Sequence, residues 1–161
     1  MESICFKPIG TIFTPYKEAA GTPIQAAAAV GVKGRIEILP EYQEGLQDLE
    51  GFSHLILLYV FHLSRGYALR VKPFLDDVKR GVFATRAPAR PNPIGLSVVR
   101  LKRVDGTTLY ISDVDMLDGT PLLDIKPFVP ELDHRTGARS GWLEQNLAKL
   151  KEAKDDGRFI K

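Results

Sequence analysis

Short strand-like runs of apolar residues, one of them with strict alternation, recur along this chain up to residue 129. Residues 32–39 place apolar side chains at every second position, a pattern typical of a half-buried strand. Further strand-like runs are expected at residues 4–14, 54–63, 69–71, 81–85, 96–104, 107–116 and 122–129. Many short strands separated by turn residues predict a mainly β fold, either a barrel or a sandwich.

Two tight turns are expected between the later strands. Asp105-Gly106 separates the runs 96–104 and 107–116, and Asp-Gly between two such runs is a strong hairpin signal. A second turn, Asp118-Gly119-Thr120-Pro121, precedes the last run. The run at 54–63 differs from the others because it is apolar on both faces, which favours a buried strand.

The C-terminal part of the chain changes character. Residues 141–153 predict a helix, with Ser140 in the position of an N-cap. One face of this helix would carry Trp142, Leu143, Leu147 and Leu150. Elsewhere only single helical turns are expected, at 26–29 and 41–50. We expect the 161 residues to form one domain, because the chain shows no repeat or linker.

Composition narrows the class of protein. A net charge of +2 is well below that of a dedicated nucleic-acid coat. The one cysteine, Cys5, excludes an intramolecular disulfide, and the three histidines lack metal-ligand spacing, so no metal site is expected. We see neither a signal peptide nor an apolar run near the ~20 residues of a membrane span. These features predict a soluble cytoplasmic protein without a membrane partner.

The loop at residues 83–96 is the most distinctive segment. Pro88, Pro91 and Pro93 exclude a helix there and favour a stiff extended backbone. The loop carries Arg86, Arg90 and Asn92, between strand-like runs on both sides. It would serve as a recognition surface for an anionic or nucleotide-like ligand, or simply as a proline-stiffened turn.

Several other polar residues have a structural and a functional interpretation. Asp113 and Asp115 would share a face if their strand is regular. Asp118 suits a turn, or contact with a polar ligand. His62 follows an apolar run and would be a half-buried structural residue or a polar group at the mouth of a pocket. Lys126 would be solvated or functional. These residues alone do not identify a reaction.

Two long motifs add a resemblance. Residues 81–97 read GVFATRAPARPNPIGLS, and residues 114–128 read VDMLDGTPLLDIKPF. Together with FSHL at 52–55, FH at 61–62 and GRIE at 34–37, they resemble the signatures of the TsaA-like/TrmO family, also called YaeB. The resemblance covers about residues 6–132. It implies a β-barrel that uses S-adenosylmethionine as cofactor to methylate tRNA, at N6 of the threonylcarbamoylated adenosine in position 37. It also implies a homodimer with the cofactor near the subunit interface.

The resemblance also implies site residues, transferred by motif position. The implied cofactor contacts are Gln25, His62, Leu63, Arg86, Leu96, Asp118, Gly119, Thr120 and Pro121. The candidates for a catalytic role are Asp118 and Lys126. The candidates for substrate binding are Arg90, Asn92 and Lys126.

The chain departs from the family pattern in two places. An early loop that usually reads Pro-Arg-Gln is here Pro23-Ile24-Gln25, so one arginine is missing. The bacterial tRNA enzymes carry an additional C-terminal domain where this chain is expected to have only the helix at 141–153. Two alternatives therefore stay open, namely a methyltransferase for another small substrate and a non-catalytic S-adenosylmethionine-binding regulator.

Overall fold

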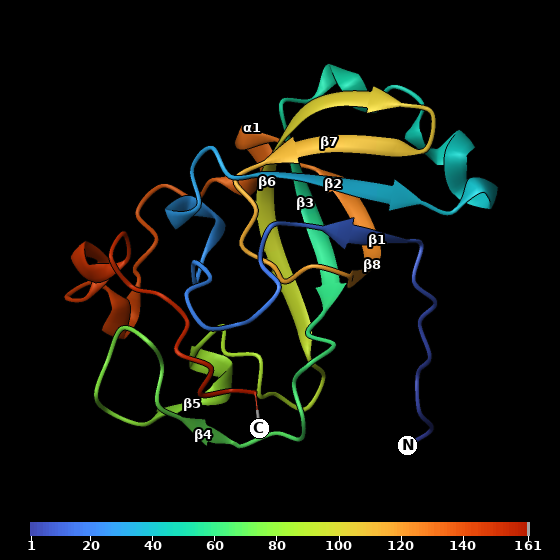
Figure 1. Ribbon diagram of the computed structural model, residues 1–161. Coiled ribbons are helices and arrows are strands. Elements are labelled where there is room, and N and C mark those ends of the chain that lie inside the picture. Colours follow the sequence, from blue (N-terminus) through green and yellow to red (C-terminus); the bar gives the residue numbers. More distant parts are fainter. Residues whose placement is uncertain (161) are drawn as a thin grey trace.

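A closed barrel of six antiparallel strands forms the centre of the computed structural model, which describes residues 1–160 (Figure 1). Around the barrel the order is β1-β2-β7-β6-β3-β8, and β8 pairs with β1 to close it. The strands are β1 (Gly10–Phe13), β2 (Lys33–Ile38), β3 (His54–Val60), β6 (Ile94–Asp105), β7 (Thr108–Ser112) and β8 (Thr120–Pro127). A separate small sheet pairs β4 (Arg70–Val71) with β5 (Arg80–Gly81). The predicted mainly β fold is confirmed, and of the two architectures considered it is the barrel.

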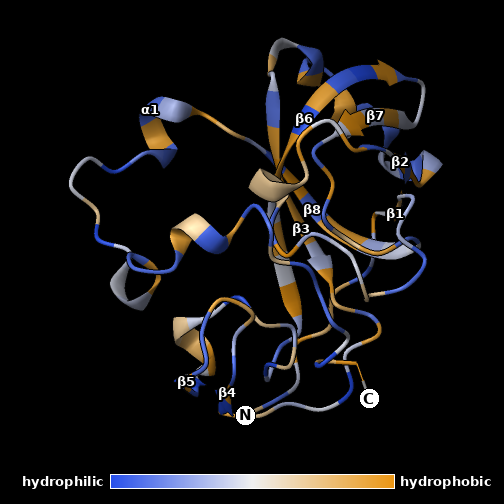
Figure 2. Ribbon diagram, turned by 60° about the vertical axis from the view of Figure 1, so that its left-hand side comes forward, coloured by the Kyte–Doolittle hydropathy of each residue, from blue (hydrophilic) through white to orange (hydrophobic). Residues whose placement is uncertain are grey.

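Alternation along the strands fills the barrel. In β3, every second side chain is buried, namely Leu55, Leu57 and Tyr59, while the residues between them are half-buried. Hydrophobic and hydrophilic segments likewise alternate along β6 in Figure 2. The resulting core consists of Ile12, Ile36, Ile38, Leu55, Leu57, Tyr59, Val99, Leu109, Ile111, Val114, Met116 and Leu122. Side chains therefore occupy the interior of this small barrel, as its strand number requires.

The longest strand, β6, connects two parts of the sheet. Its first half pairs with β3, and its second half pairs with β7 through a register shift between Leu101 and Arg103. The hairpin expected at Asp105-Gly106 is present, since Asp105 pairs with Thr108.

The strand directions divide the loops between two mouths. Strands β1, β3 and β7 end, and strands β2, β6 and β8 begin, at one mouth. The connections 14–32, 61–93 and 113–119 therefore all lie there, below and to the left of the barrel in Figure 1. The connection 39–53 and the β6–β7 turn lie at the opposite mouth. We call the first of these the loop-rich mouth.

Helical structure is limited to short segments. They are η1 (Ala26–Ala28), η2 (Pro40–Leu46), η3 (Leu49–Gly51), η4 (Val82–Ala84), α1 (Pro130–Asp133), η5 (Gly141–Leu143) and η6 (Leu147–Lys149). None of the helices in residues 1–160 has the length and apolar character needed to cross a membrane.

The predicted helix at 141–153 is wrong. Two separate 3₁₀ turns, η5 and η6, stand in its place, and Ser140 makes no side-chain capping bond. Gly141, the first residue of η5, has φ +56°, which lies outside the right-handed α region, so no α-helix begins at this residue. Trp142 instead donates its indole N–H to the carbonyl of Ala84 at 2.8 Å, so contact with the loops decides the local structure.

The predicted strands at 4–14 and 81–85 differ most from the observed ones. The first, at 4–14, is reduced to β1, since residues 1–8 are exposed and Pro8 has no N–H for a ladder. At 81–85 the chain turns after β5 into η4. The carbonyl of Val82 accepts hydrogen bonds from both the backbone N–H and the hydroxyl of Thr85. This carbonyl therefore closes a turn and does not pair with a neighbouring strand.

The residues after α1 fold back against the loop-rich mouth. Lys154 forms an isolated bridge with Pro23, and the N–H groups of Asp155 and Gly21 donate to Thr22 and Asp155 respectively. Phe159 packs on a second small cluster formed by Val71, Val82 and Ala87. We call residues 141–160 the tail; it contacts both the loop at 14–32 and the loop at 61–93.

Candidate functional site

Two residues implied as cofactor contacts meet at the loop-rich mouth. Arg86, in the proline-rich loop, donates from Nη1 to Oε1 of Gln25 at 2.8 Å, across 61 residues of sequence. Gln25 precedes η1 in the connection between β1 and β2. The arginine is exposed, so its remaining N–H groups face solvent or a ligand.

A second group of implied contacts lies where β3 ends and β8 begins. Nδ1 of His62 is 3.5 Å from the hydroxyl of Thr120, a weak contact. Desolvation lowers the pKa of His62, which favours the neutral ring. Leu63 and Leu96 are 41% and 46% exposed, so both offer apolar surface at the same mouth.

The Asp118 turn is held from several sides. Its carboxylate accepts from the Thr14 N–H at 3.0 Å and forms an ion pair with Lys17 at 2.5 Å. Its own N–H donates to Tyr16, and the N–H of Gly119 donates to Ile12. The hydrogen bond from Lys17 lowers the pKa of Asp118. The turn is therefore clamped against β1 and the start of the loop at 14–32, with Pro121 next to it in β8.

The proline-rich loop is stiff but not simply extended. Its backbone makes two very tight turns, with the N–H of Arg90 donating to Pro88 and that of Ile94 donating to Asn92. Nη1 of Arg90 is bonded to the carbonyls of Thr85 and Ala87, at 3.0 and 3.1 Å. Arg90 therefore holds the loop together, whereas the side chain of Asn92 is exposed.

Lys126 is not brought to this mouth. Thr120 and Lys126 lie near opposite ends of β8, which corresponds to roughly 20 Å at about 3.3 Å per residue. Lys126 instead pairs with Asp124 at 2.9 Å and is mostly exposed. Its candidate roles thus have no support from position within one chain.

The structure shows a hydrogen-bonded chain that the sequence did not predict. Oγ of Ser97 donates to Oδ1 of Asp115 at 2.6 Å, and the hydroxyl of Tyr59 lies 3.0 Å from the same Oγ. Ser97 and Tyr59 are buried, at 3% and 4% exposure. The available signal was a serine at an inward position of the apolar strand β6.

Asp113 and Asp115 do not share a face. Asp113 has φ +68°, which breaks the alternation at the end of β7. Its carboxylate accepts from the Gly31 N–H at 2.8 Å and lies 3.8 Å from Arg100, while Asp115 turns inward to Ser97. The left-handed residue therefore separates the two carboxylates.

Burial dominates the electrostatics of Asp115. Desolvation raises the pKa of this carboxyl from its ordinary value of 3.8 to about 6, although hydrogen bonds from Ser97 and the backbone of Ala26 act in the opposite direction. Arg86 makes the smallest contribution. Asp115 and burial together also raise the pKa of Tyr59 far above its usual range, so its hydroxyl stays protonated.

A close approach between two strands holds this chain in place. Gly95 pairs with Tyr59, and a Cβ on Gly95 would lie 2.2 Å from the tyrosine ring. Only glycine leaves room for the ring at this point of β6. The glycine of the Ile-Gly motif is thus explained by packing of the aromatic side chain beneath the site.

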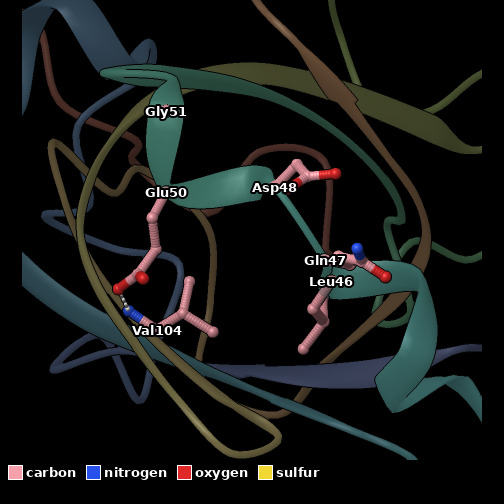
Figure 3. Close-up of a pocket in the computed structure, with 6 residues that line it drawn as sticks. All are labelled: Leu46, Gln47, Asp48, Glu50, Gly51 and Val104. Carbon is pink, nitrogen blue, oxygen red and sulfur yellow. Dashed lines mark hydrogen bonds between the residues drawn. The ribbon is translucent and has the colours of Figure 1, made fainter.

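A surface hollow lies elsewhere, at the opposite mouth (Figure 3). It has a volume of about 610 Å³ and is lined by Leu46, Gln47, Asp48, Glu50, Gly51 and Val104. Glu50 uses one carboxylate oxygen to accept from the Val104 N–H at 3.1 Å, while Gln47 and Asp48 point away from that bond. No group of three or more potential metal ligands occurs in residues 1–160. The hollow brings together none of the residues implied by the motifs.

By its fold and its site, this protein is a small closed β-barrel of six strands with polar loops gathered at one mouth. A family model described as the tRNA-methyltransferase O N-terminal domain matches residues 11–134. The chain is 59% identical over 157 residues to a probable S-adenosyl-L-methionine-binding protein of Pyrococcus abyssi, covering 98% of this chain and 85% of that one. It is 40% identical over 140 residues to the tRNA (adenine(37)-N6)-methyltransferase of Escherichia coli, covering 81% and 60%.

Solved structures agree with these relatives. A crystal structure of TrmO from Pseudomonas aeruginosa superimposes with a TM-score of 0.74 at 40% identity, covering 88% of this chain and 63% of that one. The chain therefore belongs to the tRNA-methyltransferase O (TrmO) family, and the predicted family is confirmed. It spans less than two thirds of the Escherichia coli enzyme and of the Pseudomonas aeruginosa structure, and residues after 134 lie outside the family match.

Proposed function

We propose that this chain binds S-adenosylmethionine at the loop-rich mouth and transfers its methyl group to N6 of the threonylcarbamoylated adenosine at position 37 of tRNA. The observation that carries the proposal is the meeting of Arg86 and Gln25, two motif residues far apart in sequence. His62, Thr120 and the Asp118 turn lie at the same mouth. Relatives named as S-adenosylmethionine-binding proteins and as tRNA methyltransferases support it.

The chemistry of the residues present fits this cofactor. S-adenosylmethionine combines a carboxylate, two positive groups, a ribose and an adenine. Arg86 supplies a guanidinium for the carboxylate, which it can bind with two parallel hydrogen bonds. Leu63 and Leu96 supply exposed apolar surface for the adenine, and the backbone of the Asp118 turn would supply polar contacts to its edge.

The residues of the chain act by holding and orienting. When bound, S-adenosylmethionine supplies an activated methyl group, which replaces the proton that leaves N6. Such a transfer depends on correct alignment more than on acid–base chemistry. Asp118 is a weak base because its pKa is lowered, so its contribution is to fix the turn. The Gln25 hydrogen bond fixes the direction of Arg86 in the same way.

The proposal includes a homodimer. The outer side of β3 and β6 near the loop-rich mouth carries two apolar cross-strand pairs, Leu58 with Leu96 and Val60 with Ile94. Ile94 and Leu96 are 41% and 46% exposed. We call these four residues the outer β3–β6 face; an apolar face of this kind suits a partner subunit. Because Leu96 is also an implied cofactor contact, the cofactor would lie close to the subunit interface. The cytoplasm, where tRNA is modified, is the proposed location.

Two measurements test the proposed activity. Purified chain, incubated with methyl-labelled S-adenosylmethionine and total RNA, should transfer label to tRNA, and mass spectrometry should place it on adenosine 37. tRNA from a strain without the gene should lack that methyl group. Unchanged methylation in that strain would contradict the tRNA activity.

A second candidate function is binding without turnover. It is favoured by the coverage of the relatives, because the binding protein of Pyrococcus abyssi is matched over 85% of its length and the Escherichia coli enzyme over 60%. In that case the chain would bind S-adenosylmethionine with similar affinity but release no demethylated product in the presence of RNA. Product analysis in the same labelled assay distinguishes the two functions, and it also detects methylation of a smaller acceptor.

A further inference from the structure

A carboxylate without a cationic partner lies at the base of the candidate site. Asp115 is half-buried, and no lysine, arginine or histidine among residues 1–160 forms an ion pair with it. Charged groups removed from water are normally paired with an opposite charge. Two aspartates close to it in sequence follow that rule, since Asp113 pairs with Arg100 and Asp118 pairs with Lys17. Asp115, which lies between them, has no such partner among residues 1–160 and therefore requires an explanation.

The surroundings of Asp115 orient it without neutralising it. Ser97 donates to it at 2.6 Å from β6, and Tyr59 supports Ser97 at 3.0 Å from β3. Both residues belong to the strands of the barrel wall, and the ring of Tyr59 lies directly against Gly95. A carboxylate held in this way is already oriented toward a ligand. Such preorganisation reduces the conformational entropy that is lost on binding.

The nearest positive charge is committed to another residue. Arg86 donates to Gln25 at 2.8 Å and is exposed, and it makes only the smallest contribution to the electrostatics of Asp115. The mouth thus presents a guanidinium and a carboxylate that do not neutralise each other. This arrangement is complementary to a ligand that carries both a carboxylate and a positive group.

We propose that Asp115 is a binding residue that contacts a positively charged group of the ligand, while Arg86 contacts its carboxylate. This inference rests on the proposed function, in which the ligand is S-adenosylmethionine. That ligand carries two positive groups, the sulfonium and the α-ammonium, and either one supplies the required chemistry. The α-ammonium would donate a charge-assisted and hence strong hydrogen bond to Asp115, whereas the sulfonium would be attracted to it by charge alone.

Calorimetry with three probes tests the inference. The intact chain and the Asp115→Asn variant are titrated at neutral pH with S-adenosylmethionine, S-adenosylhomocysteine and methylthioadenosine. S-adenosylhomocysteine lacks the sulfonium charge, and methylthioadenosine lacks both positive groups. Asparagine keeps the acceptor for Ser97 but removes the negative charge. We expect Asp115→Asn to weaken S-adenosylmethionine binding by about tenfold or more and to leave methylthioadenosine binding unchanged.

The result with S-adenosylhomocysteine identifies which positive group contacts Asp115. An equal loss with S-adenosylhomocysteine assigns the contact to the α-ammonium, and no loss with it assigns the contact to the sulfonium. A loss of the same size for all three probes, or no loss for any, overturns the inference. If the unsubstituted chain binds no S-adenosylmethionine, the proposed function itself fails, which is a different result from an unaffected Asp115→Asn variant.

Two further variants control for structural effects. Asp113→Asn removes a carboxylate two residues away that already has a cationic partner, and asparagine tolerates its left-handed backbone. It should bind all three probes as the unsubstituted chain does. Ser97→Ala keeps the charge of Asp115 but removes its orienting bond, so it should cause a smaller loss restricted to the charged probes. Thermal unfolding of each variant verifies that the barrel is intact.

Discussion

Arg86 is the positive group most directly tied to the candidate site, since it already bonds Gln25 in the facing loop. Replacing it with alanine removes charge-assisted hydrogen bonds to the ligand carboxylate. We expect Arg86→Ala to weaken S-adenosylmethionine binding by about 1.5–3 kcal/mol, or roughly 10- to 150-fold in Kd. Calorimetry measures this directly, with Arg139→Ala, an exposed arginine in another segment, as the control. Unchanged affinity for Arg86→Ala would remove this residue from the site.

Asp115 should reduce the stability of the fold at neutral pH. The folded state raises the pKa of Asp115 to about 6, so the protonated carboxyl is the form that the fold accommodates. The fold is therefore more stable at low pH, and it loses this stability as the pH rises from about 4 through 6. Each pKa unit corresponds to about 1.4 kcal/mol. The free energy of unfolding of Asp115→Asn should therefore be about 1–3 kcal/mol higher than that of the unsubstituted chain at neutral pH.

The groups around Asp115 determine how this prediction is checked. Arg86, Tyr59 and Tyr16 are its charged and titratable neighbours, and the pKa values of both tyrosines are raised, so neither tyrosine changes charge between pH 4 and 7. Denaturant unfolding across that range should show the gap between variant and parent closing below pH ~4. A gap independent of pH would show that Asp115 carries no burial cost.

Gly95 is the position where packing tolerates least change. An added methyl group would overlap the ring of Tyr59, whose hydroxyl holds Ser97. Overpacking of this kind costs about 1–3 kcal/mol, so Gly95→Ala should lower the melting temperature clearly. Gly51→Ala is the matched control, because a Cβ there meets no atom within 4 Å. Equal melting temperatures for the two variants would contradict the close packing described here.

The tail connects the two loops that carry Gln25 and Arg86. It pairs with Pro23 through Lys154 and reaches Ala84 through the indole of Trp142, over which Arg80 also lies. Trp142→Ala should therefore loosen the loop around Ala84 while leaving the barrel core unchanged, since that core contains no tail residue.

Hydrogen exchange and calorimetry check this prediction together. Amides at 83–90 should exchange faster in Trp142→Ala, and Kd for S-adenosylmethionine should rise roughly three- to tenfold because the competent loop conformation is less populated. Leu147→Ala, an exposed position in the same tail, should show neither effect. A normal exchange rate at 83–90 would show that the tail does not support the loop.

The strands of this protein were more predictable than its tail for a physical reason. In β2, the alternation of Ile36 and Ile38 with charged residues reports directly which side faces the core. In the tail, the spacing of Trp142, Leu143 and Leu147 suggested one helix face, yet Trp142 contacts a loop that is distant in sequence, and Leu147 is exposed. The spacing of apolar residues predicts an element reliably when that element packs on a regular surface such as a sheet. The tail packs on loops, which offer no regular surface.

At the scale of the whole molecule, the proposed homodimer can be tested at the outer surface of the barrel. If the outer β3–β6 face is a subunit interface, a charge placed there should separate the subunits. Ile94→Asp should shift the chain from dimer to monomer in analytical ultracentrifugation, because an unpaired carboxylate would be buried. Leu132→Asp, at an exposed leucine of α1, should have no effect on the mass. A monomeric parent chain would contradict the proposed homodimer.

The sequence by itself determined the β class, the hairpin at Asp105-Gly106, the family and several polar residues that lie at the loop-rich mouth. These follow from signals written in neighbouring residues, such as alternation, turn chemistry and long motifs. It also indicated that the proline-rich loop is not helical, since each proline acts on its own backbone.

Only the tertiary structure decided which polar groups meet. The bond between Arg86 and Gln25, the clamp on Asp118, the distance of Lys126 and the inward turn of Asp115 all depend on the closure of the barrel. Closure joins β8 to β1 and brings the ends of β1, β3 and β7 to one mouth. Contacts between segments far apart in the chain leave no local pattern, and desolvation of a carboxylate exists only after the surrounding strands have assembled.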